Sequence, residues 1–235
     1  MSNKNILTFA VCQSLKSHMD HPIFWIQKLD KKGQSKELHD AWIDLIQRIE
    51  KGSILEQKLV KCLKKFYRVY QNWPQKFLNG ITILHISTKF GYKSIVEFIV
   101  SYNNNPNPSN EDGFTPIYLA SYNGHIDVVK FLATKVDDPN PPTNNGFTPI
   151  YAASMNGHID IVRFLATKVD NPNPPNNAGF TPIFVAAECG NIDVVRFLAT
   201  KVANPNSAAV NGATPLSIAT LNGHTDIVEF LSSII

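Results

Sequence analysis

The chain of 235 residues is poor in several features that mark specialised classes of protein. Its three cysteines, Cys12, Cys62 and Cys189, are odd in number and far apart, which argues against a disulfide framework. The sequence Asn-Pro-Ser at 107–109 is the nearest approach to an N-glycosylation acceptor, and its proline excludes it. Apolar runs extend over a few residues, far short of the ~20 that span a bilayer, and the first residues lack the apolar core of a secretory signal. We therefore expect a protein of the cytoplasm, with the nucleus as the alternative.

Charged residues are also scarce, at 17%, whereas a hydrophobic content of 43% is enough for a packed core. The net charge of +3 conceals an asymmetry between the two parts of the chain. Residues 1–80 carry 14 Lys/Arg against 7 Asp/Glu, a net charge of +7, whereas residues 81–235 carry 8 against 12, a net charge of −4. The length suits one or two domains, and the charge difference favours two parts with different surfaces.

The sequence lacks the signatures of catalysis and cofactor binding. It contains no phosphate-binding glycine loop, no nucleophile elbow and no carboxylate pair placed by a motif. His18 and His21 stand near Cys12, but no fourth ligand is close, so they make a poor zinc set. We expect that the protein is not an enzyme and uses no cofactor and no metal.

The sequence does contain an internal repeat of 33 residues. GFTPIYLA, GFTPIYAA, GFTPIFVA and GATPLSIA begin at Gly113, Gly146, Gly179 and Gly212. A second landmark, NGHIDVVKFLATKV at Asn123, returns in the following units, and GITILHIS one period before Gly113 is a degenerate first copy. A fixed period of this length is typical of stacked helical units.

Each unit has the signals of two short helices followed by a turn. Thr115-Pro116 begins the first helix as cap and first helical residue. The glycine of Asn123-Gly124 ends it, because glycine tolerates positive φ. A second helix with an apolar stripe follows, and then a Pro/Asn-rich turn. Two such helices cannot bury their apolar faces alone, so the units are expected to stack as a solenoid.

These motifs resemble the ankyrin-repeat family, through TPIYLA, TPIYAA, TPIFVA and TPLSIA and the NGH that follows three of them. The resemblance covers about residues 80–235. It implies an all-α ankyrin-repeat solenoid of helix–turn–helix–finger units that recognises proteins through a rigid concave surface, without specifying the partner. The expected repeats are residues 79–109, 110–142, 143–175, 176–208 and 209–235. The implied function is a scaffold or adaptor that binds a protein partner, and we expect a monomer.

The chain departs from the family pattern at the end of the second helix. Where the family commonly has glycine, this chain has Asn103, Val136, Val169 and Val202. Because a β-branched residue strongly disfavours positive φ, we predict that these helices end without a left-handed cap. Our hypothesis is that the three valines turn inward. The family also implies that the histidines equivalent to His125 hydrogen-bond the backbone of a neighbouring loop, and we expect that His85 has a structural role as well.

In the family, partners contact the finger tips and the exposed side of the first helix. The matching positions here are Lys89, Phe90, Glu111, Asp112, Phe114, Tyr122, Asn144, Phe147, Met155, Asn177, Phe180, Glu188 and Leu221. The three finger phenylalanines should form one column, with two interpretations: anchors for a partner, or rings that pack finger against finger. The residues at Tyr122, Met155, Glu188 and Leu221 differ between repeats, and this variation in a fixed frame suits partner-specific contact. A column of Lys135, Lys168 and Lys201 is interpreted as a solvated face at helix C-termini.

Residues 1–78 show no repeat and are predicted to form a separate helical region. Apolar spacing predicts four helices, over about 3–18, 22–30, 36–50 and 54–72. The last carries five Lys/Arg residues on one face. One interpretation is a cap with a solvated basic face at the end of the solenoid. The alternative is a regulatory scaffold tethered to an acidic membrane or to nucleic acid through helix 54–72.

Overall fold

The computed structural model describes residues 80–102 and 104–235. Two compact units divide the chain. The described residues of the first unit are 80–87, 92–102 and 104, and the second unit comprises Thr88–Gly91 and Asn105–Ile235. The four helices predicted within 1–78, including the basic helix 54–72, lie outside the described residues.

The described part of the first unit holds most of α5 (Ile83–Lys89) and the whole of α6 (Lys93–Tyr102). His85, in α5, is buried to 1% exposure, and its Nδ1 accepts a hydrogen bond of 3.0 Å from the N–H of Thr82. This bond links the imidazole to the residue that precedes the helix, which confirms the predicted structural role of His85. Helix α6 buries an apolar stripe at helical spacing, as its sequence predicts. The stripe consists of Ile95, Val96, Phe98 and Ile99.

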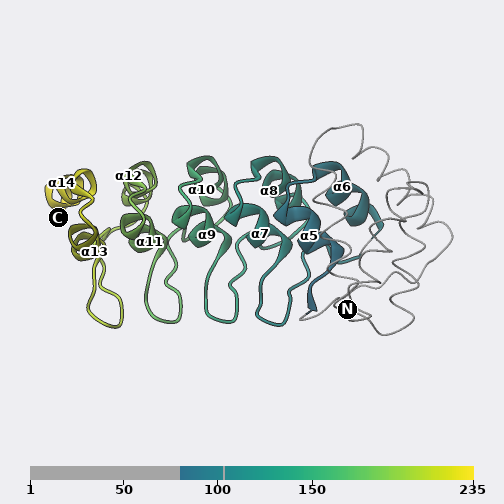
Figure 1. Cartoon of the computed structure of the whole chain (residues 1–235), viewed down its shortest axis with the longest axis horizontal. Coiled ribbons are helices and arrows are strands. Elements are labelled where there is room, and N and C mark those ends of the chain that lie inside the picture. The colour runs from purple at the N-terminus through teal and green to yellow at the C-terminus, as the bar shows by residue number, and fades with distance from the viewer. Residues whose placement is uncertain (1–79, 103) are drawn as a thin grey trace, which may run out of the picture. The chain divides into compact units, whose positions relative to one another are not determined.

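The second unit is a stack of helix pairs, and Figure 1 shows the pairs side by side with their connecting loops hanging on one side. No strand occurs among the described residues, so the predicted all-α class is confirmed there. The first helix of each pair packs on the first helix of the next, and the second helices do the same. The pairs are α7 (Pro116–Tyr122) with α8 (Ile126–Ala133), α9 (Pro149–Met155) with α10 (Ile159–Ala166), α11 (Pro182–Glu188) with α12 (Ile192–Ala199), and α13 (Pro215–Asn222) with α14 (Thr225–Ile234). The loop before the first helix of each pair is called a finger here: the first is 107–114, the second 140–147, the third 173–180 and the fourth 206–213.

The first helices begin as the Thr-Pro motif predicts. Thr115 lies in the extended region and its Oγ1 accepts from the N–H of Tyr118, while Pro116 occupies the first helical position. The same cap recurs at the start of α9, α11 and α13. Gly124 follows α7 at a φ of +80°, a conformation that glycine adopts without strain. The start and the turn of each first helix are therefore fixed by local sequence.

An asparagine in each finger supplies a further cap that the sequence analysis did not identify. The carboxamide Oδ1 of Asn140 accepts from the N–H of Ile150, in α9, at 2.9 Å. This N–H belongs to the first turn of α9, where the helix offers no carbonyl partner. The equivalent bonds join Asn107 to Ile117, Asn173 to Ile183 and Asn206 to Leu216, at 3.0, 2.9 and 2.9 Å. Each finger is thereby tied to the start of its first helix.

The second helices α8, α10 and α12 end without a left-handed cap, as predicted, whereas Asn103, the equivalent position after α6, lies outside the described residues. The C-cap residues Thr134, Thr167 and Thr200 all lie in the right-handed helical region. The valines that follow two residues later, at 136, 169 and 202, are half-buried. Their side chains are thus partly withdrawn from solvent, in the direction that the inward-packing hypothesis expects.

The core of the second unit lies between successive helix pairs. Ile117, Ile150 and Ile183 occupy the same position of three first helices, and each is fully buried. The second helices α8, α10 and α12 each bury two adjacent apolar residues, such as Val128 and Val129 in α8. Burial of each such side chain contributes about 1.5–3 kcal/mol. The core therefore repeats with the sequence and holds the fingers in a regular series.

Candidate functional site

One face of the second unit is formed by the fingers and the first helices, and we call it the finger face. Each first helix ends on it with an exposed side chain. The exposed fractions are 43% for Tyr122, 36% for Met155 and 78% for Leu221, and Glu188 is exposed as well. These four residues were predicted as the variable contact positions, and the structure places one in each repeat.

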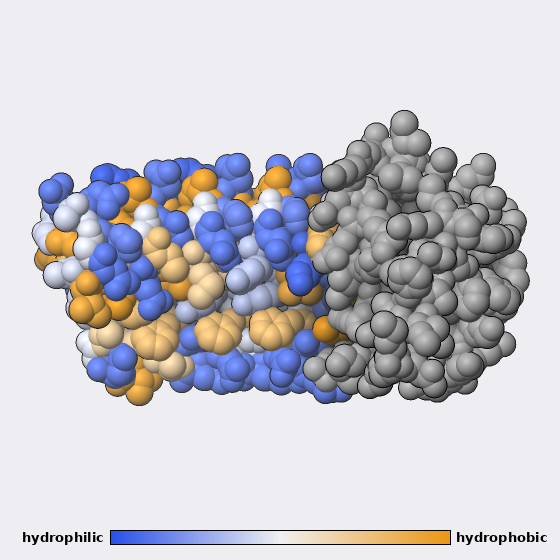
Figure 2. All heavy atoms as spheres, in the orientation of Figure 1, coloured by the Kyte–Doolittle hydropathy of each residue, from blue (hydrophilic) through white to orange (hydrophobic). Residues whose placement is uncertain are grey.

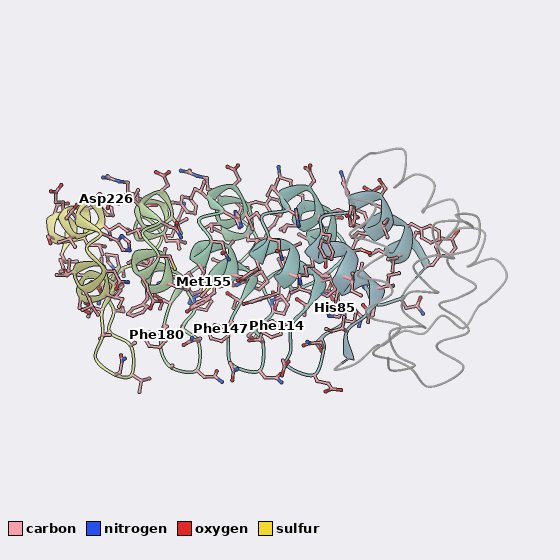
Figure 3. The ribbon with its side chains drawn as sticks, in the orientation of Figure 1. His85, Phe114, Phe147, Met155, Phe180 and Asp226 are labelled. Carbon is pink, nitrogen blue, oxygen red and sulfur yellow. The ribbon has the colours of Figure 1, made fainter. Side chains whose placement is uncertain are left out.

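The finger phenylalanines form a second feature of this face, which we call the aromatic row. Phe114, Phe147 and Phe180 are half-buried and follow one another in a line across the repeats in Figure 3. Figure 2 shows a row of apolar surface in the same place. The predicted column of phenylalanines is therefore present. In Figure 3, Met155 is labelled next to the row, on the side of the first helices.

The rings of the row pack against their own repeats. Phe114 lies 5.0 Å from the ring of Tyr118, between centroids, and Phe147 lies 5.0 Å from Tyr151. Phe180 and Phe184 make the equivalent pair at 4.6 Å. These ring contacts join each finger to the first turn of its own helix, and among the described residues no ring of the row pairs with a ring of the next finger. Whether a ring also packs on the backbone of the next finger stays a prediction. One side of each ring is held by its own repeat, and all three phenylalanines are half-buried.

Neighbouring fingers are joined instead by asparagines at their tips. Asn144 donates from its backbone N–H to Asp112 O at 3.0 Å and from Nδ2 to Glu111 O at 2.8 Å. Asn177 makes the same pair of bonds to the preceding finger, to Asn145 O and Asn144 O. A Cβ at Gly113 would stand 2.6 Å from the N of Asn144, so the glycine permits this close approach. Asn144 and Asn177 were predicted as partner contacts. In the structure, each uses its backbone N–H and one hydrogen of its side-chain amide to align the fingers.

The finger face from Asn105 onward carries no cation. Its charged residues are Glu111 and Asp112 in the first finger and Glu188 in α11, and all three are exposed. The six Lys/Arg residues of 105–235 all lie on the second helices or directly after them, at 130, 135, 163, 168, 196 and 201. The electrostatic surface that a partner meets at the finger face is therefore acidic in this range.

Several cations of the second helices lie over aromatic rings. The Arg163 guanidinium lies 4.8 Å from the Phe197 ring centroid in the next repeat, and Arg196 lies 4.7 Å from Phe230. Such contacts contribute about 0.5–1 kcal/mol at exposed sites. The predicted lysine column is exposed, and its ammonium groups lie over rings of their own repeats. The pairs are Lys135 with Phe131, Lys168 with Phe164 and Lys201 with Phe197, at 5.6, 5.8 and 5.6 Å.

The histidines at the start of the second helices are structural. His125 Nε2 lies 3.0 Å from Lys89 O, and His158 and His224 make equivalent contacts to Tyr122 O and Glu188 O at 3.2 and 3.0 Å. In the repeat without this histidine, Asn191 donates from Nδ2 to Met155 O at 2.9 Å. Each ring therefore contacts the backbone of the preceding repeat, as the family resemblance implies, but at the last residue of its first helix rather than in a loop.

Lys89 and Phe90, the remaining predicted contact residues, lie beside this first histidine bond. Lys89 is exposed and Phe90 is half-buried, and the Lys89 ammonium lies 5.7 Å from the Phe90 ring centroid. No group of histidine, cysteine or carboxylate side chains within residues 80–102 and 104–235 could hold a metal ion.

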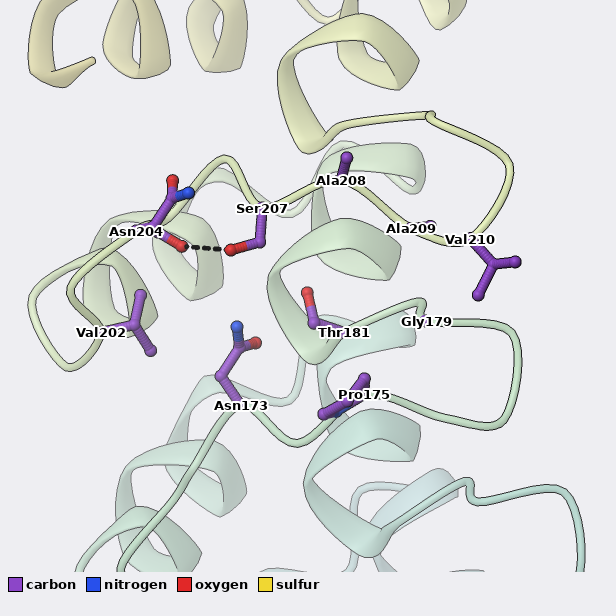
Figure 4. A pocket seen from close by; sticks show the side chains of 10 residues that line it. All are labelled: Asn173, Pro175, Gly179, Thr181, Val202, Asn204, Ser207, Ala208, Ala209 and Val210. Atoms are coloured by element: carbon purple, nitrogen blue, oxygen red, sulfur yellow. Dashed lines mark hydrogen bonds between the residues drawn. The ribbon is translucent and has the colours of Figure 1, made fainter.

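A hollow of about 490 Å³ lies between the third and fourth fingers (Figure 4). Ser207 and Ala208 line it, and they stand where the preceding repeat has Pro174 and Pro175. The smaller side chains leave space that pyrrolidine rings would fill. Its lining contains no charged residue, and consists of Asn173, Pro175, Gly179, Thr181, Val202, Asn204, Ser207, Ala208, Ala209 and Val210.

Three titratable groups near the finger face have altered pKa values. Burial raises the pKa of Tyr118 to about 12, with a smaller contribution from Tyr122, and it raises that of Tyr151 to about 12 as well. Partial burial and the neighbouring Glu188 carboxylate raise the pKa of the Cys189 thiol. Each shift favours the neutral form, so none of the three groups is activated as a base or nucleophile at neutral pH.

Comparisons with known proteins agree with this geometry. A family model described as ankyrin repeats, in three copies, matches residues 53–143, 135–209 and 171–234. A search of curated proteins gives no match. In the described part of the chain, no helix is both long and apolar enough to cross a membrane.

Proposed function

The chain belongs to the ankyrin-repeat family, whose repeats generally serve protein interaction, and from this premise we propose that it is a non-enzymatic scaffold or adaptor. Its partner is a protein, bound at the finger face. The proposed contacts are the exposed residues of the first helices together with the aromatic row. Fold alone does not identify a partner, so the proposal depends on the chemistry of this face.

One observation carries the proposal: exposed side chains vary on a frame that is otherwise constant. Tyr122, Met155, Glu188 and Leu221 occupy one position of four repeats, and they differ in size, polarity and charge. Four residues earlier in the first three of these helices, Tyr118, Tyr151 and Phe184 are aromatic and buried, so the frame changes little there, whereas α13 has the exposed Ser217. Alanine replacement at the four exposed positions should leave the fold intact, because surface substitutions usually change the stability by less than about 0.5 kcal/mol.

Affinity capture from a cell lysate tests the proposal. The intact chain is compared with a variant that carries Tyr122→Ala, Met155→Ala, Glu188→Ala and Leu221→Ala. We expect a protein that the intact chain captures and the variant does not. Thermal denaturation of both proteins checks that they are folded.

The matched control changes the opposite set of exposed side chains. A variant with Lys135→Ala, Lys168→Ala and Lys201→Ala alters the second-helix side and should capture the same protein as the intact chain. Capture that persists in the finger-face variant and disappears in the lysine variant would place binding on the second helices and refute the proposal.

A further inference from the structure

We propose that the aromatic row binds a proline-rich segment of the partner in the polyproline II conformation, with one turn of the ligand on each repeat. This inference rests on the proposed function, because it names the kind of segment that the finger face takes. The ligand carries one apolar side chain per turn and a basic residue at the end that lies near the first finger.

The aromatic row presents one apolar group per repeat, in a single line. Each of Phe114, Phe147 and Phe180 is held on one side by an aromatic ring of its own repeat, so its position is fixed before a ligand arrives. The exposed part of each ring recurs once per repeat, and the finger tips beside the row are polar. A ligand that matches this surface must also present one apolar group per step.

The distance between steps favours polyproline II. The helices α7, α9 and α11 pack directly on one another, and packed helices lie about 8–10 Å apart. Each ring of the row stands two residues before one of these helices and packs on its first turn, so the rings recur at about the same interval. A polyproline II helix advances about 9.3 Å per turn of three residues, which gives one turn per ring.

The other regular conformations do not match this interval. An α-helix advances about 5.4 Å per turn, so every second turn of its apolar stripe would face the gap between two rings. A strand places the side chains of one face about 6.7 Å apart, so only its first apolar side chain would lie opposite a ring and the next would not.

Addition of a strand to the fingers is also disfavoured by their hydrogen bonds. The backbone N–H groups of Asn144, Asn177 and Val210 donate to carbonyls of the preceding finger, at 3.0–3.1 Å. The side-chain amides of the two asparagines occupy further carbonyls of the same fingers. A ligand without a need for backbone pairing suits this surface, and proline residues have no backbone N–H to satisfy.

The negative charge of the finger face indicates that one end of the ligand carries a basic residue. Residues 105–235 carry 6 Lys/Arg against 11 Asp/Glu, a net charge of −5, and these cations lie away from the finger face. One cation precedes this range in the second unit: Lys89, exposed at the position equivalent to Tyr122, lies over the Phe90 ring. Glu111 and Asp112 are exposed together in the first finger. Their side chains make no ion pair among the described residues, so a Lys or Arg beside the proline-rich segment would find both carboxylates available.

Fluorescence anisotropy with synthetic peptides tests this inference on the full chain. The main probe has leucine at every third position of a proline background and a lysine at one terminus. A second peptide has the same composition with the leucines gathered in one block. A third is an amphipathic helical peptide, and a fourth is the first peptide with a neutral terminus. We expect the regularly spaced lysine peptide to bind at least about tenfold more tightly than the blocked peptide or the helical one.

Variants of the chain then locate the bound peptide. Phe147→Ala should weaken binding of the regular peptide about tenfold, the size of effect seen for a central aromatic anchor. Because this change also removes the ring contact with Tyr151, a gain-of-binding variant provides an independent test. Ala213 stands where the other fingers have phenylalanine, so Ala213→Phe adds a fourth ring, and a peptide one turn longer should bind this variant more tightly than the unchanged chain.

Charge reversal separates the contribution of the acidic pair. The double variant Glu111→Lys, Asp112→Lys keeps the backbone carbonyls that align the fingers. It should weaken binding of the lysine peptide several-fold and leave binding of the neutral peptide unchanged.

Equal binding of the regular and blocked peptides, or preference for the helical peptide, would overturn the inference. If no peptide binds, but the intact chain still captures a lysate protein that the finger-face variant does not, this inference fails and the proposed function stands. Lysate capture that no longer depends on the finger face is the result that removes the proposed function.

Discussion

Removal of the Asn140 side chain isolates the bond between a finger and its first helix. Asn140 is 7% exposed, and its Oδ1 accepts from the N–H of Ile150 at 2.9 Å. Ile150 is fully buried, so Asn140→Ala leaves a backbone donor without its partner in a place that water reaches poorly. An unsatisfied buried donor costs about 1–3 kcal/mol. We therefore expect the free energy of unfolding to fall by this amount.

The assay is urea unfolding of the full chain, followed by circular dichroism, with a matched variant in the same finger. Asn145 is exposed, and its backbone carbonyl, which the substitution keeps, accepts from the N–H of Asn177. Asn145→Ala should therefore change the stability by less than about 0.5 kcal/mol. Asn173→Ala removes the equivalent bond at a half-buried site and should fall between the two. Equal stabilities of Asn140→Ala and Asn145→Ala would refute the reasoning.

Three further predictions follow from buried or crowded groups. The hydroxyl of Ser121 is buried and has no hydrogen-bond partner, so Ser121→Ala should leave the stability unchanged or raise it by up to about 1 kcal/mol in urea unfolding. Gly124 and Gly223 both have positive φ, so alanine strains the backbone at either position. Gly124→Ala also places a Cβ 2.7 Å from the ring of His158 in the next repeat, whereas a Cβ at Gly223 meets nothing within 4 Å. Gly124→Ala should therefore lower the melting temperature more than Gly223→Ala does. Tyr118 and Tyr151, with pKa values of about 12 against 10 in the unfolded chain, hold their protons in the folded state above pH 10. The folded state then binds more protons than the unfolded state, so stability falls as the pH rises from 10 towards 12. A double Tyr→Phe variant should lose less stability in that range, as measured by the difference in urea midpoints.

The parts of the fold that local sequence controls were predicted correctly. Thr115 and Pro116 start a helix through atoms within four residues of each other, and Gly124 ends the turn through its own φ. The recurrence of these signals at a fixed period implies the stack, because each pair needs a neighbour to bury its apolar face. The end of the second helix without a left-handed cap followed from the steric limits of valine.

The contacts that escaped prediction join residues that are distant in sequence or depend on side-chain orientation. Asn107 caps a helix ten residues away, and only the recurrence of Pro-Asn in every unit could have drawn attention to it. Asn144 reaches the preceding finger across 33 residues. For Phe114, the period of the repeat predicted the column correctly, but the contact with Tyr118 depends on the orientation of the ring. The finger-face contacts with a partner stay a prediction, because they depend on a second molecule.

Site-specific photo-crosslinking in cells tests most directly the central claim that the finger face binds a protein. A photoreactive amino acid is placed at Met155, the exposed last residue of α9, and in a second protein at Lys168, exposed after α10. The account predicts a discrete crosslinked adduct from position 155 and none of the same mass from position 168. An adduct from position 168 alone would contradict it.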